Sequence, residues 1–277
     1  MTHGSHAAFS WPLTFLLLCL AVSYALGWVR LLRDSSRDVA AWRAISFLLG
    51  LALLWIALAS PLAHLDVQLL TIHMVKHLLT MTVAPALLLL GEPLQVLLAA
   101  FPHSTQTNIV ALARLPMVRG IARFLTRPVF CWLIAAAAIV VWHIPVVLAF
   151  TLNSEPLHIV ASATFFLAGT LFWWPVIRPW PSQRLTAEWS LLIYLFAATI
   201  PCDILSAFLV FSERVVYPVY FGVPRTVSLS VQEDQICAGA LMWTTITILY
   251  LVPAAILTMR FLSGRASHTR SRLAPSS

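Results

Sequence analysis

Residues 69–90 read LLTIHMVKHLLTMTVAPALLLL, and this stretch decides the fold class. A helix needs about 20 mostly apolar residues to cross the hydrocarbon core of a bilayer, and this stretch is long enough. Stretches of the same kind lie at 11–32, 43–60, 129–150, 157–177, 189–211 and 235–259. The sequence therefore predicts an all-α, polytopic membrane helix bundle, with seven transmembrane helices that form a single integral-membrane domain over residues 1–277.

The composition supports a protein that faces lipid. Hydrophobic residues make up 60% of the chain and charged residues 10%, whereas soluble domains carry about 45–50% and about 25%. The lipid bilayer is therefore one expected partner. The net charge of +7 falls in short loops between apolar stretches, which is the membrane pattern. No basic stripe alternates with exposed aromatic residues, so nucleic acid is not an expected partner.

The arginines predict the orientation of the bundle in a bacterial inner (plasma) membrane. They cluster at 30–43, 114–127, 178–184 and 260–272, and only Arg214 and Arg225 fall on the other side. Because positive loops stay inside, the N-terminus is expected outside and the C-terminus in the cytoplasm. Arginines follow the first span rather than precede it, so that span is not expected to be a cleaved signal peptide.

Two segments outside the predicted spans carry expectations of their own. The loop 91–128 is expected in the cytoplasm, either as a helix on an anionic leaflet or as a solvated loop with anchoring arginines. The polar tail 263–277 is expected to be disordered. Four well-separated cysteines without a Cys-x-x-Cys pair are interpreted as small apolar helix residues.

The third span holds the densest group of polar side chains. His73 and His77 are i, i+4 neighbours and share one helix face, with Met74 at its edge. Two imidazoles beside a thioether suit a soft or borderline metal, copper above all. Because helical spacing also produces such a pair by chance, packing of an ordinary helix is the competing interpretation.

Further candidate ligands lie in the outer halves of other predicted spans. His143 is in span four, His158 at the start of span five, and Met242 in span seven, below Asp234 at its start. Counting along the helices places His77, His143 and Met242 at a similar depth. The sequence therefore predicts a metal site reached from the periplasm. The alternative for His143 is a histidine that is hydrogen-bonded to a neighbouring helix. The alternative for His158 is a residue at the start of a helix in the headgroup zone.

Lys76 is a charged residue within a predicted span, where an ionisable group is costly unless it is paired. Asp203 in span six lies at nearly the same depth from the outer face. We therefore predict that Lys76 and Asp203 form an ion pair across the bundle. The alternative is that Lys76 extends outward to the interface while Asp203 forms local hydrogen bonds.

Four segments in order resemble the multi-spanning CtaG-type cytochrome c oxidase assembly factors. They are HMVKHLLTMTVAPALLLLGEP at 73–93, WHIP at 142–145, LHIV with FFLAGTLFWWPV at 157–176, and DQICAGALMW at 234–243. The resemblance implies functional positions at His73, Met74, His77, His143, His158, Trp173, Asp234 and Met242. Lys76 departs from it, because a glutamine is expected between the two histidines.

The resemblance implies a non-catalytic role in the maturation of a haem–copper oxidase at the stage of its copper centre. A haem–copper oxidase subunit and a periplasmic copper donor are the protein partners to expect, and copper is the metal. No His-Glu-x-x-His motif or activated nucleophile indicates an enzyme. Two alternatives stay open, namely a cytochrome b-like electron carrier with histidine-ligated haem and a copper or proton-coupled transporter that uses Lys76 and Asp203.

Overall fold

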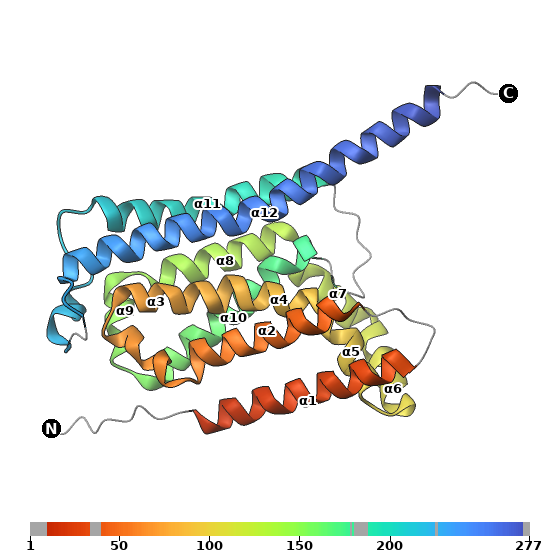
Figure 1. Cartoon of the computed structure of the whole chain (residues 1–277), viewed down its shortest axis with the longest axis horizontal. Coiled ribbons are helices and arrows are strands. Elements are labelled where there is room, and N and C mark those ends of the chain that lie inside the picture. The colour runs from red at the N-terminus through yellow and green to blue at the C-terminus, as the bar shows by residue number, and fades with distance from the viewer. Residues whose placement is uncertain (1–9, 34–39, 178, 180–187, 225–226, 274–277) are drawn as a thin grey trace.

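The computed structural model describes the whole chain except residues 1–9, 34–39, 178, 180–187, 225–226 and 274–277 (Figure 1). Its regular elements are all helices, and the described residues contain no β-strand, which confirms the all-α class. The first half comprises α1 (Trp11–Arg33), α2 (Ala41–Leu58), η1 (Pro61–Val67), α3 (Leu70–His77), η2 (Leu78–Val83), α4 (Ala84–Leu90), α5 (Pro93–Ala99), α6 (His103–Arg114) and α7 (Pro116–Leu125). The second half comprises α8 (Pro128–Trp142), α9 (Pro145–Leu152), α10 (Glu155–Ile177), α11 (Glu188–Phe211), η3 (Pro218–Gly222) and α12 (Val231–Leu273).

Among the described residues, six helices are long and apolar enough to cross a membrane. A seventh span exists if the pair α7 and α8, bent by 58°, counts as one. The bundle thus has six or seven candidate spans where the sequence predicts seven. Large apolar side chains on α1, α2, α8, α10, α11 and α12 are exposed, as expected of surfaces that meet lipid.

The predicted span 129–150 is not one continuous helix, because the helix breaks at residues 143–144. Helix α8 ends at Trp142, and α9 starts at Pro145. Proline lacks a backbone N–H and disfavours a helical conformation in the residue before it. Ile144 is accordingly extended, with φ −62° and ψ 126°. The break places His143 at the carboxyl end of α8 instead of within a helix.

Residues 70–90 form the most buried of the candidate spans, and a π-helical turn, η2, interrupts it directly after His77. Pro85 has no N–H for the carbonyl of Met81, four residues earlier. This carbonyl lies against Gly169 of α10, so closely that a Cβ atom at Gly169 would come within 1.9 Å of the oxygen. Single π-helical turns inside α-helices occur often at functional sites.

Two groups of buried apolar side chains hold the bundle together. The larger lies among α3, α8, α10, α11 and α12, and the smaller among α1, α2, α4 and α5. In the smaller group the Tyr24 hydroxyl donates to the Gly91 carbonyl over 2.7 Å, and its ring stacks on Phe47. The continuous helix α3–η2–α4 contributes to both groups and therefore runs through the middle of the molecule (Figure 1).

The two ends of the bundle differ in structure (Figure 1). One end carries α5, α6 and α7, so the segment 91–128, expected as a surface helix or a solvated loop, contains three helices. The other end carries η1, α9 and the start of α12. Helix α12 extends well past its predicted end at 259, to Leu273, and thus includes much of the segment predicted as a disordered tail.

Candidate metal site

Three histidines meet at the end of the bundle that carries η1 and α9. His73 and His77 project from one face of α3, and His143 reaches them from the end of α8. One ring nitrogen from each lies within 4.8 Å of those of the other two. The ring centroids of His77 and His143 are 5.4 Å apart. Among the described residues this is the group of histidine, cysteine and acidic side chains arranged to hold a metal ion.

Hydrogen bonds fix which nitrogen of His143 is available. Its Nδ1 lies 2.7 Å from the Ile139 carbonyl, which can only accept a hydrogen bond, so Nδ1 carries the proton. The Nε2 atom then carries a lone pair. This atom is buried and has no hydrogen-bond partner among the described residues. A buried polar nitrogen without a partner is costly, and a metal ion would satisfy it.

His73 and His77 face each other through their Nε2 atoms at a distance of 2.7 Å. At this distance one ring donates its N–H to the lone pair of the other, so the pair shares a proton that a bound metal ion would have to displace. His73 is 2% exposed, and its Nδ1 has no hydrogen-bond partner in the described part of the chain. The three imidazoles therefore fit a metal ion that favours neutral nitrogen ligands.

A cavity of about 30 Å³ adjoins the histidines, and His77 and His143 line it. The predicted ligands Met74 and Met242 line the same cavity, so the structure brings five of the six predicted metal ligands into one region. Trp173 is buried, and its ring packs against that of Tyr250, which lines the cavity. Trp173 and His158 lie fifteen residues apart on α10, which corresponds to about 22 Å of helix, so these two predicted residues are not neighbours.

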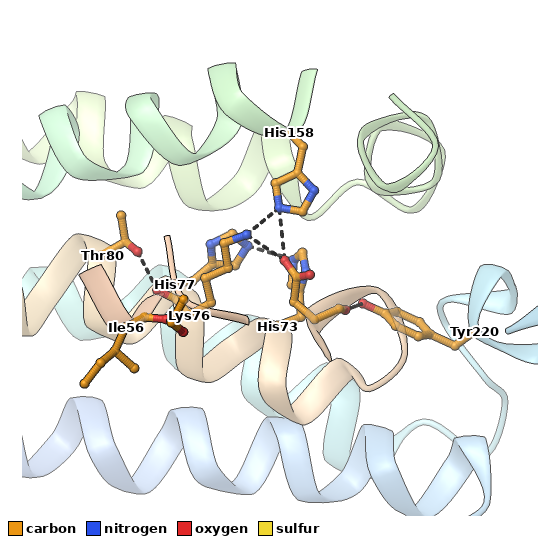
Figure 2. Close-up of polar contacts among 9 residues, drawn as sticks. Ile56, His73, Lys76, His77, Thr80, His158 and Tyr220 are labelled. Atoms are coloured by element: carbon orange, nitrogen blue, oxygen red, sulfur yellow. Dashed lines mark hydrogen bonds and ion pairs between the residues drawn. The ribbon is translucent and has the colours of Figure 1, made fainter. Parts of the chain in front are cut away.

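Lys76 does not pair with Asp203, and that prediction is wrong. Its Nζ lies 2.7 Å from Oδ2 of Asp66 and 2.5 Å from Nε2 of His158 (Figure 2). Asp66 belongs to η1, which directly precedes α3 and packs against it, so its carboxylate reaches Lys76 from the neighbouring element. The Lys76–Asp203 prediction compared depths only, and depth leaves the side of a helix undetermined.

His158 is directed to Asp66 and Lys76 and does not join the three-histidine group. Its Nε2 lies 3.0 Å from Oδ2 of Asp66. Burial alone would raise the pKa of Asp66, but the hydrogen bond from His158 and the charge of Lys76 hold this pKa well below its usual range. The Tyr220 hydroxyl donates to the Asp66 backbone carbonyl over 3.1 Å, which fixes η1 against η3.

Asp234 belongs to α12. Its side chain lies against the start of α3 and caps that helix. Its carboxylate accepts hydrogen bonds from the backbone N–H groups of Leu70 and Thr71, at 2.9 and 3.1 Å. The first N–H groups of a helix have no partner within the helix, and a carboxylate is a preferred acceptor for them. Asp234 thus fixes the helix that carries His73 and His77.

Sequence reasoning missed Asp66, and no pattern could have found it. It lies in a short connection between predicted spans, outside the apolar stretches in which buried charges attract attention. The sequence also gives no sign of a role for Cys202, which lines the cavity beside His143.

The fold and the site define a class of protein: a helical membrane protein with a buried histidine cluster beside a cavity lined by methionines. A comparison with protein-family models then gives the family. The model of the cytochrome c oxidase caa3 assembly factors (Caa3_CtaG) matches residues 22–263, and the chain belongs to this family. Searches of the curated proteins and of the solved structures found no match. The resemblance seen in the four sequence segments is thereby confirmed.

Proposed function

We propose that this protein holds copper at His73, His77 and His143 and supports its insertion into a haem–copper oxidase. Membership of the oxidase assembly family supplies the client. The observation that carries the metal is the group of three ring nitrogens within 4.8 Å, one of them the buried, unpartnered Nε2 of His143. Copper is here a cargo, and the residues named would hold it until delivery.

The same proposal places the site near the periplasmic face of a bacterial inner membrane. The arginine distribution supports this orientation, because the clusters 114–127 and 260–272 lie at the end opposite the histidines. A periplasmic copper donor could then load the site from outside, and the oxidase subunit would receive copper within the membrane.

Neither alternative function has support of comparable specificity. An electron carrier with axial histidines needs ligands on opposite faces of a haem, but His73 and His77 lie on one helix face with their Nε2 atoms 2.7 Å apart. The transporter hypothesis used Lys76 and Asp203 as a relay, and Lys76 is paired with Asp66 instead.

Deletion of the gene, with complementation by variants, tests the proposal. We expect the oxidase purified from the deletion strain to lose copper and retain haem, and His143→Ala to reproduce this loss. His103→Ala is the matched control, because His103 is an exposed histidine at the opposite end of the bundle. Normal copper content and activity of the oxidase in the deletion strain would defeat the proposal.

A further inference from the structure

Four sulfur-containing side chains line the cavity beside His77 and His143. They come from separate elements, namely Met74 of α3, Met81 of η2, Cys202 of α11 and Met242 of α12. All four are buried, with at most 7% of each residue exposed. Methionines are frequent packing residues, so their burial alone would not indicate a site.

A second observation distinguishes this cavity from ordinary packing. His143 lines it, is 7% exposed, and keeps a buried Nε2 without a hydrogen-bond partner among the described residues. A nitrogen lone pair and sulfur atoms therefore border the same small space. The cavity volume of about 30 Å³ exceeds the roughly 10–15 Å³ that one water-sized particle needs.

The chemistry of the lining selects among metal ions. Thioethers are soft ligands that favour Cu(I), whereas Zn²⁺ is bound by thiolates, imidazoles and carboxylates; the cavity lining offers three thioethers and one thiol. The lining contains no aspartate or glutamate. A divalent ion would thus bring two positive charges into a low-dielectric space without a carboxylate to balance them. The two carboxylates that contact the histidine helix already have partners, Asp66 in Lys76 and Asp234 in the N–H groups of Leu70 and Thr71.

We propose that this cavity is a Cu(I)-selective site in which Cys202 and Met242 complete the ligand set begun by His77 and His143. This inference rests on the proposed copper function and adds the oxidation state of the cargo and a thiol ligand. Cys202 is proposed as a ligand because its side chain is the sulfur that α11 contributes to the cavity lining.

X-ray absorption at the copper edge tests the ligand set in the wild-type, full-length protein, purified in detergent and loaded with Cu(I) without oxygen. We expect sulfur as well as nitrogen in the first coordination shell. Competition against a Cu(I) chelator then measures affinity, and we expect Cys202→Ala and Met242→Leu each to weaken it by about tenfold or more. Binding of Zn²⁺ should be weaker than that of Cu(I) in the wild type.

Cys131→Ala is the matched control, because Cys131 is also a buried cysteine but lies outside the cavity. Its thiol donates a hydrogen bond to the Leu125 carbonyl. This substitution should leave Cu(I) affinity unchanged. A nitrogen-only shell in the wild type, with unchanged affinity in both variants, would overturn this inference and leave the copper function intact. If the wild type binds no Cu(I) at all, both proposals fail. Because the wild-type spectrum needs no substitution, a variant that misfolds does not block the test.

Discussion

Asp234 shows how one side chain can organise the site without touching it. The carboxylate sits on α12 but completes the hydrogen bonding of the first turn of α3, over two backbone N–H groups and the Thr71 hydroxyl. It is 1% exposed, so water cannot replace it. The position of His73, two residues after Thr71, consequently depends on a residue far away in the sequence.

Asp234→Ala should therefore destabilise the protein. Loss of a helix cap costs about 1–2 kcal/mol, and burial of the freed N–H groups places the effect at the upper end. The thermal unfolding midpoint in detergent measures it, with the exposed Glu213→Ala as control. An equal midpoint in both variants would contradict the capping role.

Asp66 makes the stability of the folded protein depend on pH in the acid range. The carboxyl faces Lys76 and His73 of α3, His158 of α10 and Tyr220 of η3, and its pKa in the folded protein lies below the ordinary value of 3.8. An acidic group whose pKa is lower in the folded protein than in the unfolded chain stabilises the folded protein at pH values above the unfolded pKa. This stabilisation is lost as the pH falls through the pKa of the folded protein.

Asp66→Asn should lower the free energy of unfolding by about 3–5 kcal/mol at pH 7, because it leaves the Lys76 charge buried without its partner. The difference from the wild type should shrink below about pH 4, since the carboxyl then begins to bind a proton in the unfolded wild-type chain while it stays ionised in the folded protein. Unfolding midpoints measured from pH 3 to pH 7 check this. Asp203→Asn, at the partner predicted from the sequence, should change little; a larger effect there would restore the discarded pair.

At the scale of elements, the contact between η2 and α10 decides how the histidine helix sits in the bundle. The π-helical turn and Pro85 leave the Met81 carbonyl directed at Gly169, and only a residue without a side chain permits this approach. The turn starts directly after His77, so the same distortion that frees the carbonyl also sets the direction of the helix below the site.

Gly169→Ala should push the two elements apart, because its Cβ would lie 1.9 Å from the Met81 carbonyl oxygen. Overpacking of this kind costs about 1–3 kcal/mol, and the shift should also weaken metal binding. Gly120→Ala in α7 is the control, since a Cβ there meets nothing within 4 Å. It should be neutral or stabilise by up to about 1 kcal/mol. Equal unfolding midpoints for the two variants would show that the contact is unimportant.

At the scale of the whole molecule, the two ends of the bundle have different chemistry. The end with α5, α6 and α7 carries Arg114, Arg119, Arg123 and Arg127, and the sequence has no acidic residue between Glu92 and Glu155. The opposite end carries the histidines and Asp66. In the orientation that we propose, the first end faces the anionic cytoplasmic leaflet and the second receives copper from the periplasm.

Reporter fusions test that orientation. Alkaline phosphatase, which is active only outside the cytoplasm, should be active when inserted after Gly222 and inactive after Gly120. A fluorescent protein that folds only in the cytoplasm should give the reverse pattern. Activity of the phosphatase after Gly120 would mean that the bundle is inverted and that the histidines face the cytoplasm.

The sequence by itself determined the all-helical membrane class, the approximate positions of most spans and the i, i+4 pair of His73 and His77, because hydropathy and helical periodicity are local properties of the chain. The four ordered segments also indicated the family. Only the tertiary structure decided that His143 joins this pair while His158 turns to Asp66. It also decided that Lys76 pairs with Asp66, that Asp234 caps α3 and that Cys202 lines the cavity. These outcomes depend on which faces of distant helices meet, and counting residues gives the depth of a side chain but not its direction.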